Sequence, residues 1–479
     1  GKLQLNYGTQ NNSKLDDASN LILAGGQLDL TGGSHTEVVG GTVLNAGASS
    51  VTRVTGSTST LRMNTITRNA GATLSVAANI TDTDNTNVNG ILGGWATVGN
   101  EWAKIGATPG DALIFAAVAG DYKVNTAEST PWVSTDNIKL STSGTRVLTA
   151  DRQINTLNIA HAVTVDIGAG QAMRIENGGL LVSGNYNPVI QNGTLTAGVG
   201  SDAAGELIVQ ENSSATYTLT INSTIADNGA GAVALTKSGT GKLRLAGANT
   251  YSGDTYLNAG VLILDNNNAL GNGTLRLRRL TTIDSTKGEG DVVLAGNPQV
   301  WDGDFTFTGT TNLNMGNGPV SLGTIPAGVA PYSSRVITFA AASANKTLTL
   351  AGPISGDFGL TKAGNYGTLV LAGANTYSGD TTLTGGSTTI SPLRLGADDV
   401  LPNGPGKVNV ALNYANAMLD LHGFSDTING LFNSTTTPYV DNTKPDSTST
   451  LTVGDNDVSS TFSGVIRNTG SGAVVNLAK

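Results

Sequence analysis

The side chains that could do chemistry in this sequence are few and widely spaced. Histidine occurs only at His35, His161 and His422, in three separate segments. The sequence has no His-x-x-x-His pair for zinc, no Gly-x-Ser-x-Gly nucleophile elbow and no phosphate-binding loop ending in Gly-Lys-Ser/Thr. Cysteine is absent, which excludes thiolate metal sites and cysteine nucleophiles. We therefore interpret the histidines as solvated residues or corner residues.

Two acidic clusters carry oxygen ligands at alternate positions. Asp82 and Asp84 precede a run of asparagines that includes Asn85, and Asp455 and Asp457 form the second cluster. Hard oxygen ligands at this spacing are weak candidates for calcium. Neither cluster fits the twelve-residue calcium loop, because its bidentate Glu and central Gly are misplaced. The competing interpretation is that these Asp and Asn side chains cap turns.

An enzyme that degrades polysaccharides is the main catalytic alternative. Hydrolysis would need two carboxylates about 5 to 10 Å apart across a cleft. Lyase action would need a base and acidic calcium ligands on adjacent coils. No combination of Asp, Glu and Arg recurs at such a spacing. We predict no enzymatic activity, no catalytic residue and no cofactor.

Two further clusters are candidates for contacts with a partner. Arg276 and Arg278 share one face of a strand and form either a solvated face or a contact patch for an acidic neighbour. Trp95, Trp102 and Trp132 lie in an aromatic-rich segment, 91–135. These aromatics either pack the segment onto the rest of the protein or form an exposed platform for sugar rings or a neighbouring chain. The same segment holds the one plausible short helix, 111–119.

The elements that must position these residues are short strands. The 479 residues include 64 Gly and only 13% charged residues, against about 25% in ordinary globular chains. In 241–245, Leu243 and Leu245 face one way while Lys242 and Arg244 face the other, which predicts a strand buried on one face. Gly and Asn corners separate such strands. The net charge of −9 opposes nucleic-acid binding, and no apolar run is long enough for a membrane helix.

A long repeat decides among the all-β architectures. Residues 245–255 recur letter for letter at 371–381, within copies at 225–271 and 350–396, and a partial copy occupies 460–479. Self-similarity of this kind favours a solenoid over a sandwich or barrel. We predict an all-β, right-handed parallel β-helix of about 20 coils. In this prediction, residues 1–90 and 136–479 are β-solenoid, and 91–135 are a loop excursion.

The repeated segments 235–264 and 360–389 resemble the autotransporter-associated β-strand repeat, also called the passenger-associated transport repeat. The resemblance is carried by a lysine, a Gly-rich step, Leu-x-Leu, then Gly-Ala-Asn-Thr-Tyr-Ser-Gly and a Thr-rich strand. It implies a β-helical passenger displayed outside a bacterial cell, and implies no enzymatic activity. The expected function is thus a structural or adhesive surface solenoid. A glycan-binding module that uses Trp95–Trp132 is the second hypothesis, with a surface glycan or a host or matrix component as ligand.

The repeat also makes specific predictions. Leu243, Leu245, Leu369 and Leu371 should be buried; Gly253 and Gly379 should sit where a Cβ is unwelcome; Asn249 and Asn375 should bond backbone groups at corners. The sequence starts in an alternating strand at 1–5 and stops at 476–479, which matches the lead-in of the repeat. We therefore expect each end to be covered by continuing chain or by a second copy, head to tail.

Overall fold

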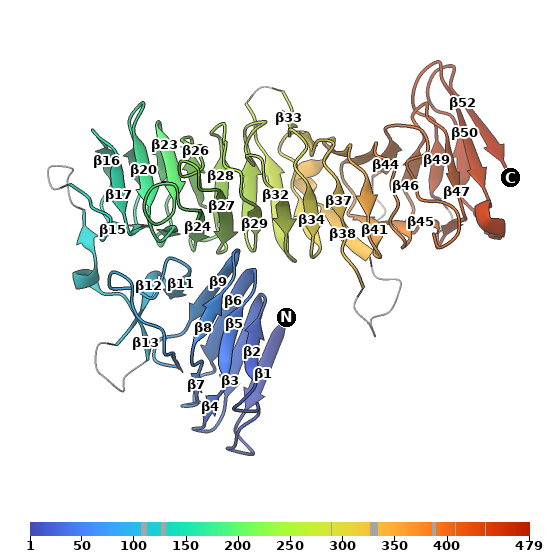
Figure 1. Cartoon of the computed structure of the whole chain (residues 1–479). Helices are drawn as coiled ribbons and strands as arrows, with labels where there is room; N and C mark the ends of the chain where they lie inside the picture. The colour runs from blue at the N-terminus through green and yellow to red at the C-terminus, as the bar shows by residue number, and fades with distance from the viewer. Residues whose placement is uncertain are drawn as a thin grey trace. The chain divides into compact units, whose positions relative to one another are not determined.

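The computed structural model describes residues 1–106, 113–125, 131–288, 290–325, 334–385, 389–407, 409–435 and 437–479. The helices in these ranges are three single 3-10 turns, η1 (Ala119–Asp121), η2 (Ala341–Ser343) and η3 (Asp455–Asp457). The strands stack in parallel as a β-solenoid of about 19 turns, which confirms the predicted parallel β-helix (Figure 1). The chain divides into two compact units, 1–262 with 271–273, and 263–270 with 274–479.

The first unit begins with a solenoid that we call the arm, residues 1–105. Each of its coils contributes to up to three parallel sheets. The first sheet holds β1 (Lys2–Asn6), β3 (Gly26–Thr31), β6 (Gly47–Arg53), β9 (Ala72–Val76) and β11 (Ala96–Val98); the second holds β2 (Asn20–Leu23), β5 (Gly41–Leu44) and β8 (Ile66–Arg68); the third holds β4 (Thr36–Val38), β7 (Thr60–Arg62) and β10 (Thr81–Asp82). Alternate apolar residues, such as Leu28 and Leu30, point into a common core.

An antiparallel hairpin ends the arm. Strand β11 pairs with β12 (Glu101–Ile105), and β12 pairs with β13 (Ile114–Ala116), both antiparallel. Gly99, with φ of +58°, supplies the left-handed conformation that a two-residue hairpin turn needs. The predicted short helix at 111–119 is therefore wrong, because 114–116 is a strand and only Ala119 lies in a helical turn, η1; residues 111 and 112 lie outside the described residues. Strand pairing has overridden the helical preference of an alanine-rich segment.

The rest of the first unit is the central solenoid, residues 123–262. Its first sheet holds β14 (Lys123–Val124), β15 (Asn137–Leu140), β18 (Thr156–Ile159), β21 (Gly179–Val182), β24 (Gly205–Glu211), β27 (Val233–Ser238) and β29 (Thr255–Leu257); its second holds β16 (Gly144–Val147), β19 (Val163–Asp166), β22 (Val189–Gln191), β25 (Thr218–Ile221) and β28 (Lys242–Leu245); its third holds β17 (Arg152–Ile154), β20 (Ala172–Ile175), β23 (Thr194–Ala197) and β26 (Thr224–Ile225). Strand β30 (Val261–Leu264) spans the boundary between the units.

Within the first unit the arm packs sideways on the central solenoid, as the blue and green strands show (Figure 1). An ion pair joins Arg68 Nη2 to Glu206 Oε1 at 2.8 Å. The hydroxyls of Thr73 and Ser238 are 2.8 Å apart, and Asn258 Nδ2 donates to the carbonyl of Gly71 at 2.7 Å. These contacts are polar, and near the end of the arm Trp102 adds an apolar contact in one buried cluster with Leu181 of the central solenoid.

The second unit continues the same parallel architecture. One sheet holds β31 (Leu275–Leu277), β34 (Gln299–Trp301), β37 (Val320–Ser321) and β40 (Ile354–Ser355); another holds β32 (Thr281–Ser285), β35 (Phe305–Phe307), β38 (Ser334–Phe339), β41 (Gly359–Ala363), β43 (Thr381–Thr384), β45 (Val410–Leu412) and β48 (Leu431–Asn433); a third holds β33 (Val292–Val293), β36 (Leu313–Asn314), β39 (Thr347–Leu350), β42 (Thr368–Leu371), β44 (Ser391–Leu395), β46 (Ala417–Asp420), β49 (Tyr439–Asp441) and β51 (Val465–Arg467); the last holds β47 (Asp426–Ile428), β50 (Thr448–Val453) and β52 (Val474–Ala478).

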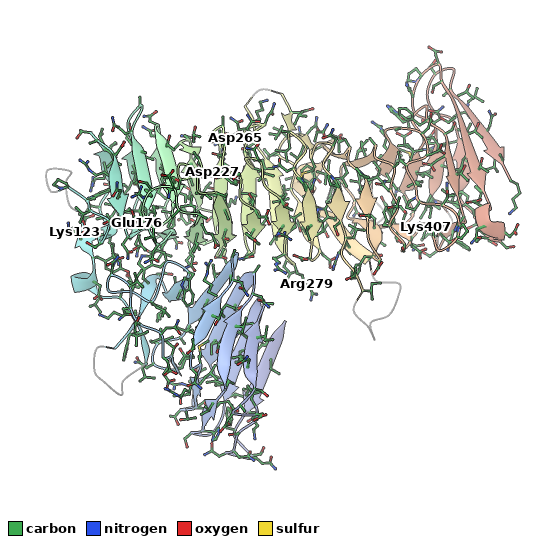
Figure 2. The ribbon with its side chains drawn as sticks, viewed as in Figure 1. Lys123, Glu176, Asp227, Asp265, Arg279 and Lys407 are labelled. Carbon is green, nitrogen blue, oxygen red and sulfur yellow. The ribbon has the colours of Figure 1, made fainter. Side chains whose placement is uncertain are left out.

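Corner residues hold adjacent coils together. In the central solenoid, Asn155 Nδ2 donates to Asn137 Oδ1 at 2.7 Å, and Asn177 Nδ2 donates to Asn155 Oδ1 at 2.9 Å. Asp227, labelled in Figure 2, accepts the backbone N–H groups of Val233 and Ser252. Such side chains satisfy backbone and amide groups that a buried corner would otherwise leave unpaired.

Candidate functional site

The residues that recur in the two repeat copies are the first candidates for function. Leu243, Leu245, Leu369 and Leu371 are all 0% exposed, as predicted from the alternation. Asn249 Oδ1 accepts the backbone N–H of Ile225 at 2.8 Å. In the second copy Asn375 Oδ1 accepts the N–H of Ile354 at the same distance. Both Leu and Asn predictions are confirmed, and both residue types serve the coil itself.

The glycine and tyrosine of the repeat are also packed inward. A Cβ on Gly253 would lie 2.6 Å from the carbonyl oxygen of Val233, and one on Gly379 would lie 2.2 Å from the nitrogen of Gly359. The prediction that neither position accepts a side chain is confirmed. Tyr251 and Tyr377 are 0% exposed. Burial raises the pKa of both tyrosine hydroxyls, so they stay protonated.

The lysine of the repeat is buried rather than displayed. Lys237 Nζ donates to the carbonyls of Ser238 and Gly239, both at 2.8 Å, and to that of Ala259 at 3.2 Å. Burial lowers the pKa of Lys237, and the nearby Glu211 carboxylate opposes that shift. The lysine thus ties adjacent turns of backbone together.

The lysine of the second copy has a related environment. Lys362 Nζ donates to the carbonyl of Tyr366 at 3.1 Å and contacts the hydroxyl of Ser391. It also lies 4.2 Å from the centre of the Phe339 ring, a cation–π geometry. Burial lowers the pKa of Lys362 to about 7.

The structure also pairs buried charges that the sequence did not single out. Asp420 and Asp441 are in register on β46 and β49. Arg394 Nε lies 2.8 Å from Asp420 Oδ2, and Arg467 Nε lies 2.8 Å from Asp441 Oδ2. Both aspartates are 0% exposed. A signal was available in the sequence, since Asp420-Leu-His and Asp441-Asn-Thr place both carboxylates at strand ends, but the register between coils decided the pairing.

The first calcium candidate is occupied by a guanidinium. Arg62 Nη1 lies 3.1 Å from Asp82 Oδ1, and Arg62 Nη2 lies 2.6 Å from Asp84 Oδ1. Burial raises the pKa of Asp82, while Arg62 acts in the opposite direction. Asp455 and Asp457 of the second candidate lie in the turn η3. In the described part of the chain no three His, Cys, Asp or Glu side chains are grouped as a metal site would need.

The arginine pair and the three histidines lie in separate parts of the structure. Arg276 and Arg278 flank Leu277 at the end of β31, and Arg278 Nη1 lies 3.3 Å from Asp302 Oδ2. His35 stacks on Tyr7, His161 stacks on Tyr186, and His422 Nδ1 lies 3.0 Å from the hydroxyl of Thr443. The structure brings no two of the three histidines together.

The tryptophans of the excursion pack inward. Trp102 is 0% exposed, in a cluster with Tyr122 of the excursion and Leu181 of the central solenoid. Trp132 is 3% exposed, and Trp95 is half-buried against the core of the arm. An aromatic platform for a ligand would need free ring faces, which Trp102 and Trp132 do not offer. Their burial favours the interpretation that they fasten the excursion to the solenoid.

These features define the class of protein. It is a parallel β-solenoid in which a recurring Lys, Leu-x-Leu, Asn, Tyr and Gly pattern builds whole coils. Two segments, 235–264 and 360–390, match the family model described as passenger-associated-transport-repeat. The chain carries two copies of this repeat, as its resemblance indicated.

One curated relative extends the comparison beyond the repeats. The chain is 31% identical over 332 residues to "Adhesin BmaC autotransporter" of Brucella suis biovar 1 (strain 1330). The match covers 65% of this chain but only 8% of that relative's length. No solved structure matches. Among the described residues, no helix combines the length and the apolar character needed to cross a membrane.

Proposed function

We propose that this chain is a non-enzymatic, adhesive passenger segment of a bacterial surface protein, displayed outside the cell. The main observation behind this proposal is that the residues shared by the two repeat copies point into the protein. Lys237, Tyr251 and Gly253, like Lys362, Tyr377 and Gly379, all face packed backbone or core. The repeat therefore builds the solenoid and leaves the outward faces free for contacts. Similarity to an autotransporter adhesin supports the same function.

Adhesion can be measured directly with the purified chain. Beads coated with it should bind cultured host cells or matrix proteins more than albumin-coated beads do. Beads coated with a Leu245→Asp variant provide the matched control, because an unpaired buried charge should unfold the coil. Equal attachment of coated and albumin beads would refute the adhesive function. Release of new reducing ends or unsaturated sugars from a panel of polysaccharides would refute its non-enzymatic character.

We further propose self-association, head to tail, as one mode of contact. Support comes from exposed apolar residues of β51 and β52, including Ile466 and Leu477, which line a cavity of about 300 Å³ with Phe462. Apolar surface of this kind is usually covered in a solenoid array. Sedimentation at rising concentration tests this proposal: a Leu477→Lys variant should shift the distribution toward monomer. A wild-type chain that stays monomeric throughout would argue against it.

A further inference from the structure

A groove of about 200 Å³ lies between the arm and the central solenoid, inside the first unit. Its side-chain lining consists of hydroxyl, amide and methyl groups, with neither a charged nor an aromatic residue. The residues that carry the argument are Ser50, Ser75 and Thr97 on the arm, and Gln210, Ser238 and Thr240 on the central solenoid. The volume suits a cluster of waters or one sugar ring.

The arm side of the groove is a ladder of hydroxyl groups. Ser50 on β6 is in register with Ser75 on β9, and Ser75 is in register with Thr97 on β11. Neighbouring strands of a sheet are about 4.8 Å apart. The ladder therefore presents three hydroxyls in a line at a regular spacing.

On the central solenoid, which forms the other side of the groove, hydrogen bonds hold the lining side chains in place. Gln210 is in register with Ser238, and Gln210 Nε2 donates to the carbonyl of Gly94 at 3.2 Å. Thr240 Oγ1 donates to the carbonyl of Ser213 at 2.8 Å. These bonds fix the side chains before any ligand arrives, which lowers the entropic cost of binding.

One polar side chain of the groove lining is buried without a partner among the described residues. Thr97 lines the groove and is 1% exposed, and its Oγ1 has no hydrogen bond with any described residue. Buried hydroxyls ordinarily take part in hydrogen bonds, so the Thr97 hydroxyl keeps the capacity to donate one and to accept another.

We propose that this groove binds a neutral saccharide residue. A sugar hydroxyl is both a donor and an acceptor, so it can pair with the hydroxyls of Ser50, Ser75 and Thr97, which have the same two capacities. The absence of charge on the lining gives an anionic ligand no counter-ion, and the hydroxyl ladder suits a polyol better than an apolar ligand. The site deepens the proposed adhesive function by naming a ligand class for it, and it is distinct from the buried tryptophans of the excursion.

Ligand-observed NMR on the full 479-residue chain tests the site. The probes are the methyl glycosides of glucose, galactose, mannose and N-acetylglucosamine. At least one should show saturation transfer from the wild type. Ser75→Gln fills the mouth of the groove from an exposed strand position and should abolish the signal. Ser355→Gln, at an exposed serine of β40, is the matched control and should keep it. Thr97→Val removes one hydroxyl and should weaken binding about fivefold.

Equal melting temperatures of the variants by circular dichroism separate lost binding from lost folding. No transfer to any probe from the wild type would show that the groove holds water only, and transfer that survives Ser75→Gln would place the sugar elsewhere; either result overturns the site. The bead assay distinguishes this outcome from failure of the adhesive function. Beads with Ser75→Gln that still adhere would leave adhesion intact without the groove.

Discussion

The ring of Tyr256 in β29 lies against the α-carbon of Gly71 in the arm, where an added Cβ would come within 2.4 Å of the ring. The surrounding contacts are polar: Glu206 Oε1 accepts from Gly71 N at 3.1 Å and from Thr236 Oγ1 at 2.6 Å. The arm therefore approaches the central solenoid at a point where any side chain would hold the two surfaces apart.

Gly71→Ala should loosen the arm from the central solenoid. Gly56→Ala is the matched control, because Gly56 also has positive φ, +90° against +79° for Gly71, but a Cβ there meets nothing within 4 Å. Both variants should lose about 1 to 2 kcal/mol from the left-handed conformation. Only Gly71→Ala should also make the arm more susceptible to limited proteolysis. Identical cleavage of the two variants would contradict the lateral packing.

Leu245→Ala should destabilise its unit by about 2 to 5 kcal/mol, because it leaves a cavity in the core. Leu371→Ala should cost a similar amount, since Leu371 is the equivalent residue of the second repeat and is also fully buried. Leu280→Ala, at a leucine that is 81% exposed, is the control and should change stability by less than about 0.5 kcal/mol. Urea unfolding measures all three. A large loss of stability in Leu280→Ala would contradict the assignment of Leu245 and Leu371 to the core and of Leu280 to the surface.

Tyr251→Phe should cost about 1 kcal/mol, and so should Tyr377→Phe. Each change removes a buried hydrogen bond between hydroxyl groups. The Tyr251 hydroxyl lies 2.6 Å from Thr255 Oγ1, and the Tyr377 hydroxyl lies 2.5 Å from Thr381 Oγ1. Tyr186→Phe, at a tyrosine that is 38% exposed, is the control with little expected effect. Unequal costs at the two buried positions would show that the repeats differ energetically despite their shared geometry.

Stability should rise with pH between about 7 and 10. Burial lowers the pKa of Lys362 from 10.5 to about 7 in the folded chain. The unfolded chain therefore binds more protons in this window, and the free energy of unfolding increases as pH rises. Lys362→Met should reduce that slope by up to about 1.4 kcal/mol per pH unit. Leu371→Ala, which destabilises without removing a titratable group, should keep the wild-type slope. A Lys362→Met slope equal to the wild type would mean that the ammonium stays charged in the fold.

Calcium and chelators should leave the melting temperature unchanged. The guanidinium of Arg62 already pairs with Asp82 and Asp84, so a cation at that cluster would be repelled. Differential scanning calorimetry with added calcium and with EDTA measures this. A calcium-dependent rise in melting temperature that Asp82→Asn abolishes would establish the cluster as a metal site instead.

Much of the coil was predictable because the sequence signals that specify it lie within a few residues of one another. Alternation placed Leu243 and Leu245 inside. Gly253 marked a close approach of backbone that leaves no room for a Cβ, and Asn249 marked a corner where its side chain accepts a backbone N–H. The hairpin had a local signal too, Gly99-Asn100 between extended runs, but the alanine-rich stretch after it favoured a helix instead. A strand gains its stability from a partner strand, which propensity within one segment does not reveal.

The sequence by itself determined the coil: which residues face the core, where each coil turns, and that the 245–255 pattern is built twice. Only the tertiary structure decided what lies between coils distant in the chain. It buried Trp102 against Leu181, turned Lys237 inward, and set the hydroxyls of Ser75 and Thr97 opposite Gln210. The physical reason is that the polar part of the lateral contact uses outward-facing Ser, Thr, Asn and Gln. Those residue types serve equally on a strand face in water, so only the path of the chain through the hairpin selects which of them meet.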